Sequence, residues 1–147
     1  MKFTTALVSI GVAAICAAQA QPDSRFDGIW VGMETASAGS AHLSANEQKF
    51  VPPPHQTQII IAQGGTMVGI IGGICPGRYE KVQRTGDTLT FGAKDCVLKI
   101  SLSHDGKSLI EQGNCFRVIE WLDRAYYGKF PHAMLGLAIT GTFHRSK

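Results

Sequence analysis

The chain has 147 residues and a formal net charge of +3, from 14 Lys and Arg against 11 Asp and Glu. This small positive charge comes without a Lys/Arg cluster, which argues against nucleic acid as a partner. The length suits one domain with one modest core rather than two domains.

The first 20 residues have the three parts of a secretory signal peptide. Lys2 supplies the positive charge, the stretch from Leu7 to Ala18 is apolar and uncharged, and Ala18-Gln19-Ala20 supplies small residues for cleavage. We therefore expect residues 1–20 to be removed on export. The mature protein would be a single domain over residues 21–147, periplasmic or secreted.

Two alternatives to a cleaved signal remain open. A retained membrane anchor is disfavoured because the apolar run is short for a span, and no later stretch is apolar enough, so the mature form is expected to have no membrane span. A lipoprotein modified at Cys16 is disfavoured because bulky Ile15 stands where a lipidation site needs a small residue.

The mature part begins with a predicted strand and then a long loop. Asp27 to Glu34 has the composition of a strand, and residues 35–56 are rich in Ala, Ser and Gly and end in Pro52-Pro53-Pro54. Three prolines favour polyproline conformation, which forms no sheet hydrogen bonds. The segment is either a lid or binding loop, or a plain connector.

From Thr57 onward, short runs rich in β-formers alternate with turn signals, a pattern typical of an antiparallel meander. Glycines within the most apolar run, Gly69, Gly72 and Gly73, indicate bends, so we expect a curled sheet or a small closed barrel. The predicted strands are Gln58–Ala62, Met67–Cys75, Arg78–Arg84, Thr88–Gly92, Cys96–Ser103, Ser108–Phe116 and Leu137–His144.

One short helix is expected near residues 117–127. Val118, Trp121, Leu122 and Ala125 recur at the spacing of one helix face. The same stretch, from Phe116 to Leu122, is also compatible with an extended strand. The fold class is therefore mostly β, with this helix as the exception.

Three cysteines remain after cleavage, and an exported protein usually oxidises pairs. If the hairpin around Asp105-Gly106 is symmetric, Cys96 faces Cys115, with Cβ atoms roughly 4.5–5.5 Å apart, close to bridging reach. We predict a Cys96–Cys115 disulfide with Cys75 left as a thiol. Cys75 is the alternative partner, because its strand ends at the same end of the sheet.

Catalytic, cofactor and metal sites are not indicated by any motif. The five histidines are scattered, and the sequence has no CxxC, HExxH, GxSxG, GxGxxG or phosphate-binding loop. We therefore expect no cofactor and no metal. An aromatic group near the C-terminus either belongs to the core or forms a binding surface. Its members are Trp121, Tyr126, Tyr127 and Phe130.

Gly28-Ile29-Trp30 on the first strand resembles the motif of the calycins, the group of small β-barrels that includes the lipocalins. In many lipocalin-like proteins this tryptophan closes one barrel end beneath an arginine from near the end of the fold. The resemblance implies that role for Trp30 and Arg145, although the second lipocalin signature, a TDY-like turn, is absent. It also implies a ligand-binding cup, or an inhibitor built on one.

The function expected from the sequence is thus that of a small exported binding protein without catalysis. Its partner would be a small apolar ligand inside the barrel, or another protein inhibited through the loops. The alternative is an envelope structural or interaction protein that acts through an exposed aromatic patch. An enzyme is the least favoured class.

Overall fold

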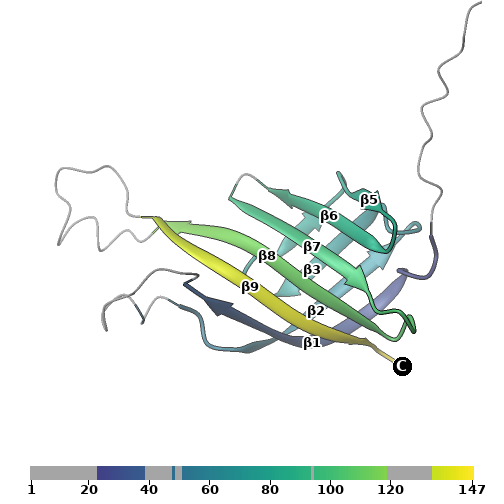
Figure 1. The fold of residues 1–147 in the computed structure, drawn as a ribbon, viewed down its shortest axis with the longest axis horizontal. Helices are drawn as coiled ribbons and strands as arrows, with labels where there is room; N and C mark the ends of the chain where they lie inside the picture. Colours follow the sequence, from purple (N-terminus) through teal and green to yellow (C-terminus); the bar gives the residue numbers. More distant parts are fainter. Residues whose placement is uncertain (1–22, 39–47, 49–50, 94, 119–133) are drawn as a thin grey trace, which may run out of the picture.

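The structure is a computed structural model, and it describes residues 23–38, 48, 51–93, 95–118 and 134–147. These residues form one curled antiparallel sheet of nine strands (Figure 1). The strands are β1 (Gly28–Ser37), β2 (His55–Ala62), β3 (Met67–Gly72), β4 (Gly77–Tyr79), β5 (Gln83–Thr85), β6 (Thr88–Ala93), β7 (Cys96–Leu102), β8 (Ser108–Val118) and β9 (Met134–Arg145).

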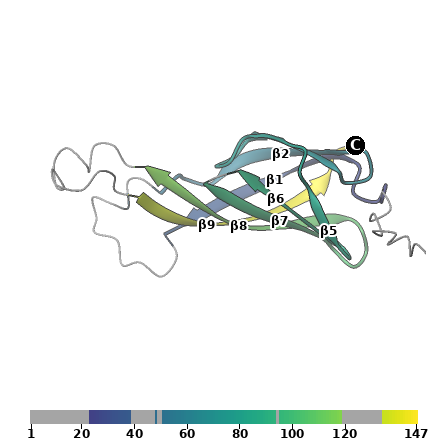
Figure 2. The same cartoon turned by 90° about the horizontal axis from the view of Figure 1, so that it is seen from above.

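The strand order is that of a meander whose first and last strands also pair. It runs β4-β3-β2-β1-β9-β8-β7-β6-β5, so the two sheet edges, β4 and β5, are consecutive in the sequence. These edges form no ladder with each other, but the curl brings their neighbourhoods together, with the rings of Tyr79 and Phe91 5.0 Å apart. The mostly β fold class is confirmed, in its curled-sheet form, and Figure 2 shows the curl from above.

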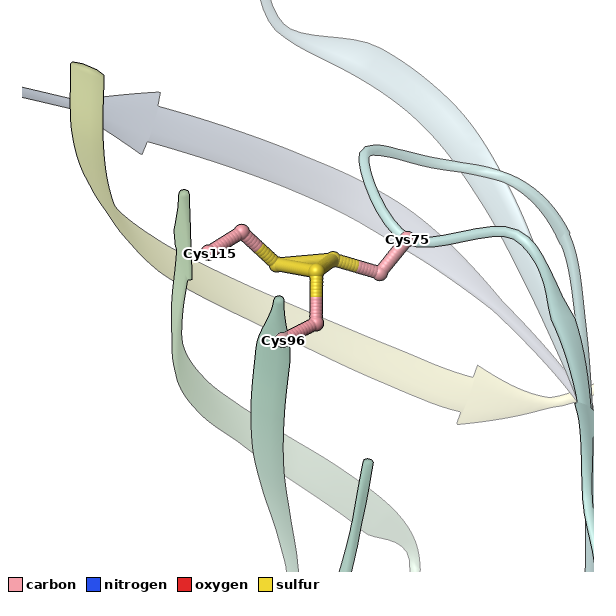
Figure 3. A group of neighbouring side chains, drawn as sticks. All are labelled: Cys75, Cys96 and Cys115. Carbon is pink, nitrogen blue, oxygen red and sulfur yellow. A yellow bond between two sulfur atoms is a disulfide. The ribbon is translucent and has the colours of Figure 1, made fainter. Parts of the chain in front are cut away.

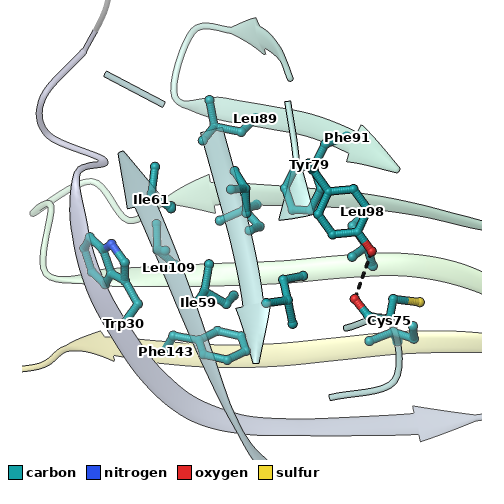
Figure 4. Close-up of a cluster of buried hydrophobic side chains, with 14 of the residues drawn as sticks. Trp30, Ile59, Ile61, Cys75, Tyr79, Leu89, Phe91, Leu98, Leu109 and Phe143 are labelled. Atoms are coloured by element: carbon teal, nitrogen blue, oxygen red, sulfur yellow. Dashed lines mark hydrogen bonds between the residues drawn. The ribbon is translucent and has the colours of Figure 1, made fainter. Parts of the chain in front are cut away.

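The concave face carries the core. Side chains alternate along each strand, because successive residues point to opposite faces, and the inward ones meet in a single cluster (Figure 4). The largest apolar side chains that are almost completely buried are Phe26, Trp30, Ile59, Leu89, Leu98, Ile100, Leu109, Leu137, Ile139 and Phe143.

The register of the β7–β8 hairpin is the one that its symmetry predicts. Cys96 pairs with Cys115, Leu98 with Gly113 and Leu102 with Leu109. The position of the turn therefore fixes the register, and the register fixes the face on which each residue of this hairpin lies.

Two expected elements differ from the observed ones. The strand expected to run to Cys75 ends at Gly72, because Gly72 and Gly73 take positive φ angles of 73° and 75° and turn the chain away from the sheet. The single run expected over Arg78–Arg84 is divided into β4 and β5.

The helix expected near residues 117–127 does not begin at 117. Arg117 and Val118 belong to β8 and pair with Leu135 and Met134 of β9, so the strand alternative is correct for these two residues. Residues 119–127 lie outside the described part, as do the aromatic group of Trp121, Tyr126, Tyr127 and Phe130 and the signal segment. Among the residues that are described, no helix is long and apolar enough to cross a membrane.

Candidate functional site

Two glutamates project into the concave face, where the other buried side chains are almost all apolar. Glu34 on β1 and Glu111 on β8 are 2% and 1% exposed. Both pair in register with Gly141, which lies on the strand between them. Gly141 has no side chain to separate them, so the two carboxyl groups share one region of the interior.

Glu34 is held by donors from neighbouring elements. Its Oε1 accepts a hydrogen bond from the backbone N–H of Ile74 at 2.8 Å, and its Oε2 accepts one from the hydroxyl of Thr57 at 3.0 Å. Both carboxyl oxygens therefore have protein partners, as a buried polar group requires.

Glu111 lacks such partners. Its Oε2 is buried and has no hydrogen-bond partner among the described residues. Burial, and secondarily the nearby charge of Glu34, raises the pKa of Glu111 to about 8. At neutral pH the side chain is therefore mainly a neutral carboxylic acid, which can both donate and accept a hydrogen bond.

The segment between β3 and β4 lies over this region, and we call residues 73–76 the plug. Ile74 and Cys75 are each 6% exposed. A side chain at position 73 would place its Cβ 2.5 Å from Oε2 of Glu34, so only glycine allows the plug to approach so closely. The hydroxyl of Tyr79 donates to the carbonyl of Cys75 at 2.9 Å, which fixes the far end of the plug (Figure 4).

Tyr79 belongs to the same electrostatic environment. Burial raises the pKa of its phenol, and the nearby Glu111 and Glu34 add to that effect. The tyrosine therefore stays neutral and can keep its hydrogen bond to the plug.

Cys75 of the plug meets the other two cysteines of the described chain, Cys96 and Cys115 (Figure 3). The sulfur atoms of Cys75, Cys96 and Cys115 all lie within 4.8 Å of one another, and each pair lies in disulfide contact. Because a sulfur atom forms one disulfide at a time, the cluster holds at most one bridge and one thiol. The Cys96–Cys115 pairing thus stays a prediction, and the structure brings its alternative partner Cys75 to the same place.

Trp30 lies at the other end of the core from Cys75 (Figure 4), and Arg145 packs over its ring. The guanidinium carbon of Arg145 lies 4.3 Å from the centroid of the Trp30 ring. The guanidinium also donates to the backbone carbonyls of Asp27 and, at 2.7 Å, of Arg25. The indole N–H of Trp30 donates to the carbonyl of Phe26 at 2.9 Å.

The carboxyl pair was not expected from the sequence, in which no two acidic residues form an obvious pair. Glu34 and Glu111 are far apart in the chain and come together only because β9 pairs with both β1 and β8. One signal was available: in the hairpin register, Glu111 falls on the same face as Leu98, Ile100 and Leu109. An acidic residue on an apolar face is the exception that a search for sites can use.

Comparisons with known proteins gave no family for this chain. No family model matches, and no curated protein matches. Among solved structures, the chain is similar to the zebrafish ileal bile acid-binding protein in complex with cholic acid, at 12% identity and a TM-score of 0.42. The match covers 84% of this chain and 100% of that one. Similarity at this level assigns neither a family nor a ligand.

The described sheet has two features in keeping with the resemblance to calycins. It is an antiparallel meander with paired first and last strands, and an arginine from the last strand lies over the tryptophan of the first.

Proposed function

We propose that this chain is a small exported binding protein that takes a small, mainly apolar ligand on the concave face of its sheet. The observation that carries the proposal is the buried, unpartnered carboxyl oxygen of Glu111. A buried polar atom without a partner costs roughly 1–3 kcal/mol, a cost that a ligand's hydrogen-bonding group would remove. The surrounding apolar side chains suit the rest of such a ligand.

The two sheet edges, which do not pair with each other, give a route to this group. β4 and β5 form no ladder with each other, and the plug beside them is held to the sheet by the hydrogen bonds of Ile74 and Tyr79. Movement of one short segment would therefore expose the carboxyl pair without breaking the central strands.

Export and the absence of catalysis are parts of the same proposal. The signal segment of residues 1–20 supports a periplasmic or secreted protein. The carboxylate of Glu34 is engaged by the plug and by Thr57, which supports a structural rather than a catalytic role for it.

A second candidate function rests on the outer face of the sheet. A shallow groove lies there, lined by Thr35, Gln112 and Thr140 and flanked by the exposed side chains of Met33 and Ile110. Both side chains flank Thr142, because Met33 and Ile110 each pair with it in register. Apolar side chains of this kind suit an envelope interaction protein that binds another protein through its surface.

A fluorescent apolar amine, 1-aminoanthracene, tests ligand binding because it has three fused apolar rings and one hydrogen-bonding group. The mature wild-type protein should bind it saturably, and Glu111→Leu should weaken binding by about tenfold, equal to about 1.4 kcal/mol. Glu80→Leu is the matched control, because the Glu80 side chain is 70% exposed and pairs with Arg78. This control should bind like the wild type.

Two results would overturn ligand binding at this site: no saturable signal with the wild type, or equal affinity in wild type and Glu111→Leu. Circular dichroism of each variant verifies folding. Met33→Ser combined with Ile110→Ser tests the second candidate, because it changes the outer face and leaves the concave face intact. Loss of probe binding in that double variant, with Glu111→Leu unaffected, would favour the outer groove.

A further inference from the structure

The cysteine cluster brings together the β7–β8 hairpin and the segment between β3 and β4, two parts of the sheet that do not pair directly with each other. Cys96 at the start of β7 and Cys115 in β8 are paired in register. Cys75 comes from the plug, which connects β3 to the edge strand β4, and neither of these strands pairs with β7 or β8. A disulfide therefore either lies within the β7–β8 hairpin or links this hairpin to the plug.

The distances between Cα atoms rank the three pairs. They are 4.2 Å for Cys96–Cys115, 6.7 Å for Cys75–Cys96 and 7.4 Å for Cys75–Cys115. Disulfides usually span about 4.4–6.8 Å, and pairs beyond about 7 Å need backbone movement. The Cys75–Cys96 distance lies within this range and the Cys96–Cys115 distance lies just below it, whereas the Cys75–Cys115 distance exceeds 7 Å. Cys96 is thus common to the two bridges that need no approach of distant backbones.

The entropy of loop closure is nearly the same for these two bridges. The sequence separations are 19 residues for Cys96–Cys115 and 21 for Cys75–Cys96. In the chain-entropy model, this difference changes the equilibrium constant by only about 1.2-fold. The populations of the two bridges therefore depend mainly on how the plug packs.

We propose that the three cysteines form an intramolecular thiol–disulfide exchange site that latches the plug. The thiolate of Cys75 attacks Sγ of Cys96, the S–S bond from Cys96 to Cys115 breaks, and Cys115 leaves as a thiolate. The proton lost by Cys75 is balanced by the proton that Cys115 gains. No net oxidation occurs, so no outside oxidant or reductant takes part in the exchange.

The two bridges have different mechanical consequences. The Cys96–Cys115 bridge joins strands that already pair, and it leaves the plug held only by non-covalent contacts, namely its hydrogen bonds and the packing of Ile74 in the core. The Cys75–Cys96 bridge ties the plug to β7 and so links the β3–β4 side of the curled sheet covalently to the β7–β8 hairpin. The exchange thereby controls the mobility of the segment that donates to Glu34.

Single Cys→Ser variants of the mature protein test the proposal by acid-quenched, non-reduced peptide mapping. Cys75→Ser should retain the Cys96–Cys115 link, and Cys115→Ser should form the Cys75–Cys96 link. Cys96→Ser should lose the disulfide completely. The wild type should show both links that contain Cys96, and no Cys75–Cys115 link.

Hydrogen exchange at the amide of Ile74 supplies a second readout. Exchange should be slower in Cys115→Ser, where the plug is tied, than in Cys75→Ser, where it is not. The amide of Leu102, which donates to the carbonyl of Asp87 at 2.9 Å, is the internal control and should be protected alike in both variants.

Four results would overturn the exchange site. Two are a Cys75–Cys115 link in Cys96→Ser and a single unchanging link in the wild type. The others are equal hydrogen exchange at Ile74 in the two bridged variants, and three free thiols in the wild type under oxidising conditions. The test involves no ligand, so its failure is separable from that of the proposed binding function.

Discussion

Arg145 covers the face of Trp30 and at the same time holds the backbone that leads into the first strand. The two residues are register partners on β9 and β1, with the guanidinium carbon 4.3 Å from the ring centroid. The same guanidinium donates to two carbonyls, those of Arg25 and Asp27. One side chain thus links the segment before β1 to the strand pair β1–β9.

Replacing Trp30 by alanine should destabilise the protein by about 3–5 kcal/mol, as large truncations in a core do. The ring is fully buried, and its N–H bond to Phe26 would be lost as well. Ile29→Ala is the control, because Ile29 is 43% exposed on the opposite face. A loss below about 1 kcal/mol in equilibrium denaturation would show that Trp30 does not close this end.

The contact between Trp30 and Arg145 should appear as a coupling energy of about 0.5–2 kcal/mol in a double-mutant cycle with Trp30→Leu and Arg145→Ala. The control cycle pairs Trp30→Leu with Arg78→Ala, because Arg78 is 69% exposed on β4. Additive effects in the first cycle, within the error of denaturant titrations, would mean that the two side chains act independently.

Local patterns of the sequence were sufficient for much of this fold. The symmetric turn at Asp105-Gly106 predicted the register of β7 and β8 residue by residue, and alternation predicted the buried face of β7. The motif around Trp30 pointed to its contact with Arg145. Each of these inferences needed only neighbouring residues or a known motif.

The plug and the carboxyl pair required long-range information. The sequence pattern predicts bends within a strand at Gly72 and Gly73, but both residues take positive φ angles and the strand ends there. Glu34 and Glu111 share the concave face only because β9 lies between β1 and β8. The order of the strands in the sheet cannot be predicted from local sequence patterns.

Gly141→Ala should destabilise the protein by about 1–3 kcal/mol through overpacking. An added Cβ would lie 2.5 Å from the Phe143 ring and 2.9 Å from Oε2 of Glu111. Gly136→Ala on the same strand is the control, because its Cβ would meet Phe116 at an ordinary 3.6 Å. Thermal melting of both variants measures the difference, and equal melting temperatures would contradict close packing at Gly141.

The last prediction concerns the pH dependence of stability that Glu111 introduces. Its pKa is raised from 4.5 to about 8 in the folded protein, mainly by burial. Between these two values the folded state keeps a proton that the unfolded state has lost. The stabilising contribution is therefore complete below pH 4.5 and falls as pH rises towards 8, by about 1.4 kcal/mol per pH unit.

Glu111→Gln should remove this slope, because glutamine has no proton to lose. Urea denaturation of the wild type and the variant across pH 5 to 8 gives the comparison, and Glu80→Gln is the control that should keep the wild-type slope. Asp23 does not interfere, since its pKa is lowered to about 2 by its bonds to Arg25 and its effect lies at lower pH. Parallel stability profiles for the wild type and Glu111→Gln would show that Glu111 is ionised in the folded protein, and the buried carboxyl would then need a partner from elsewhere.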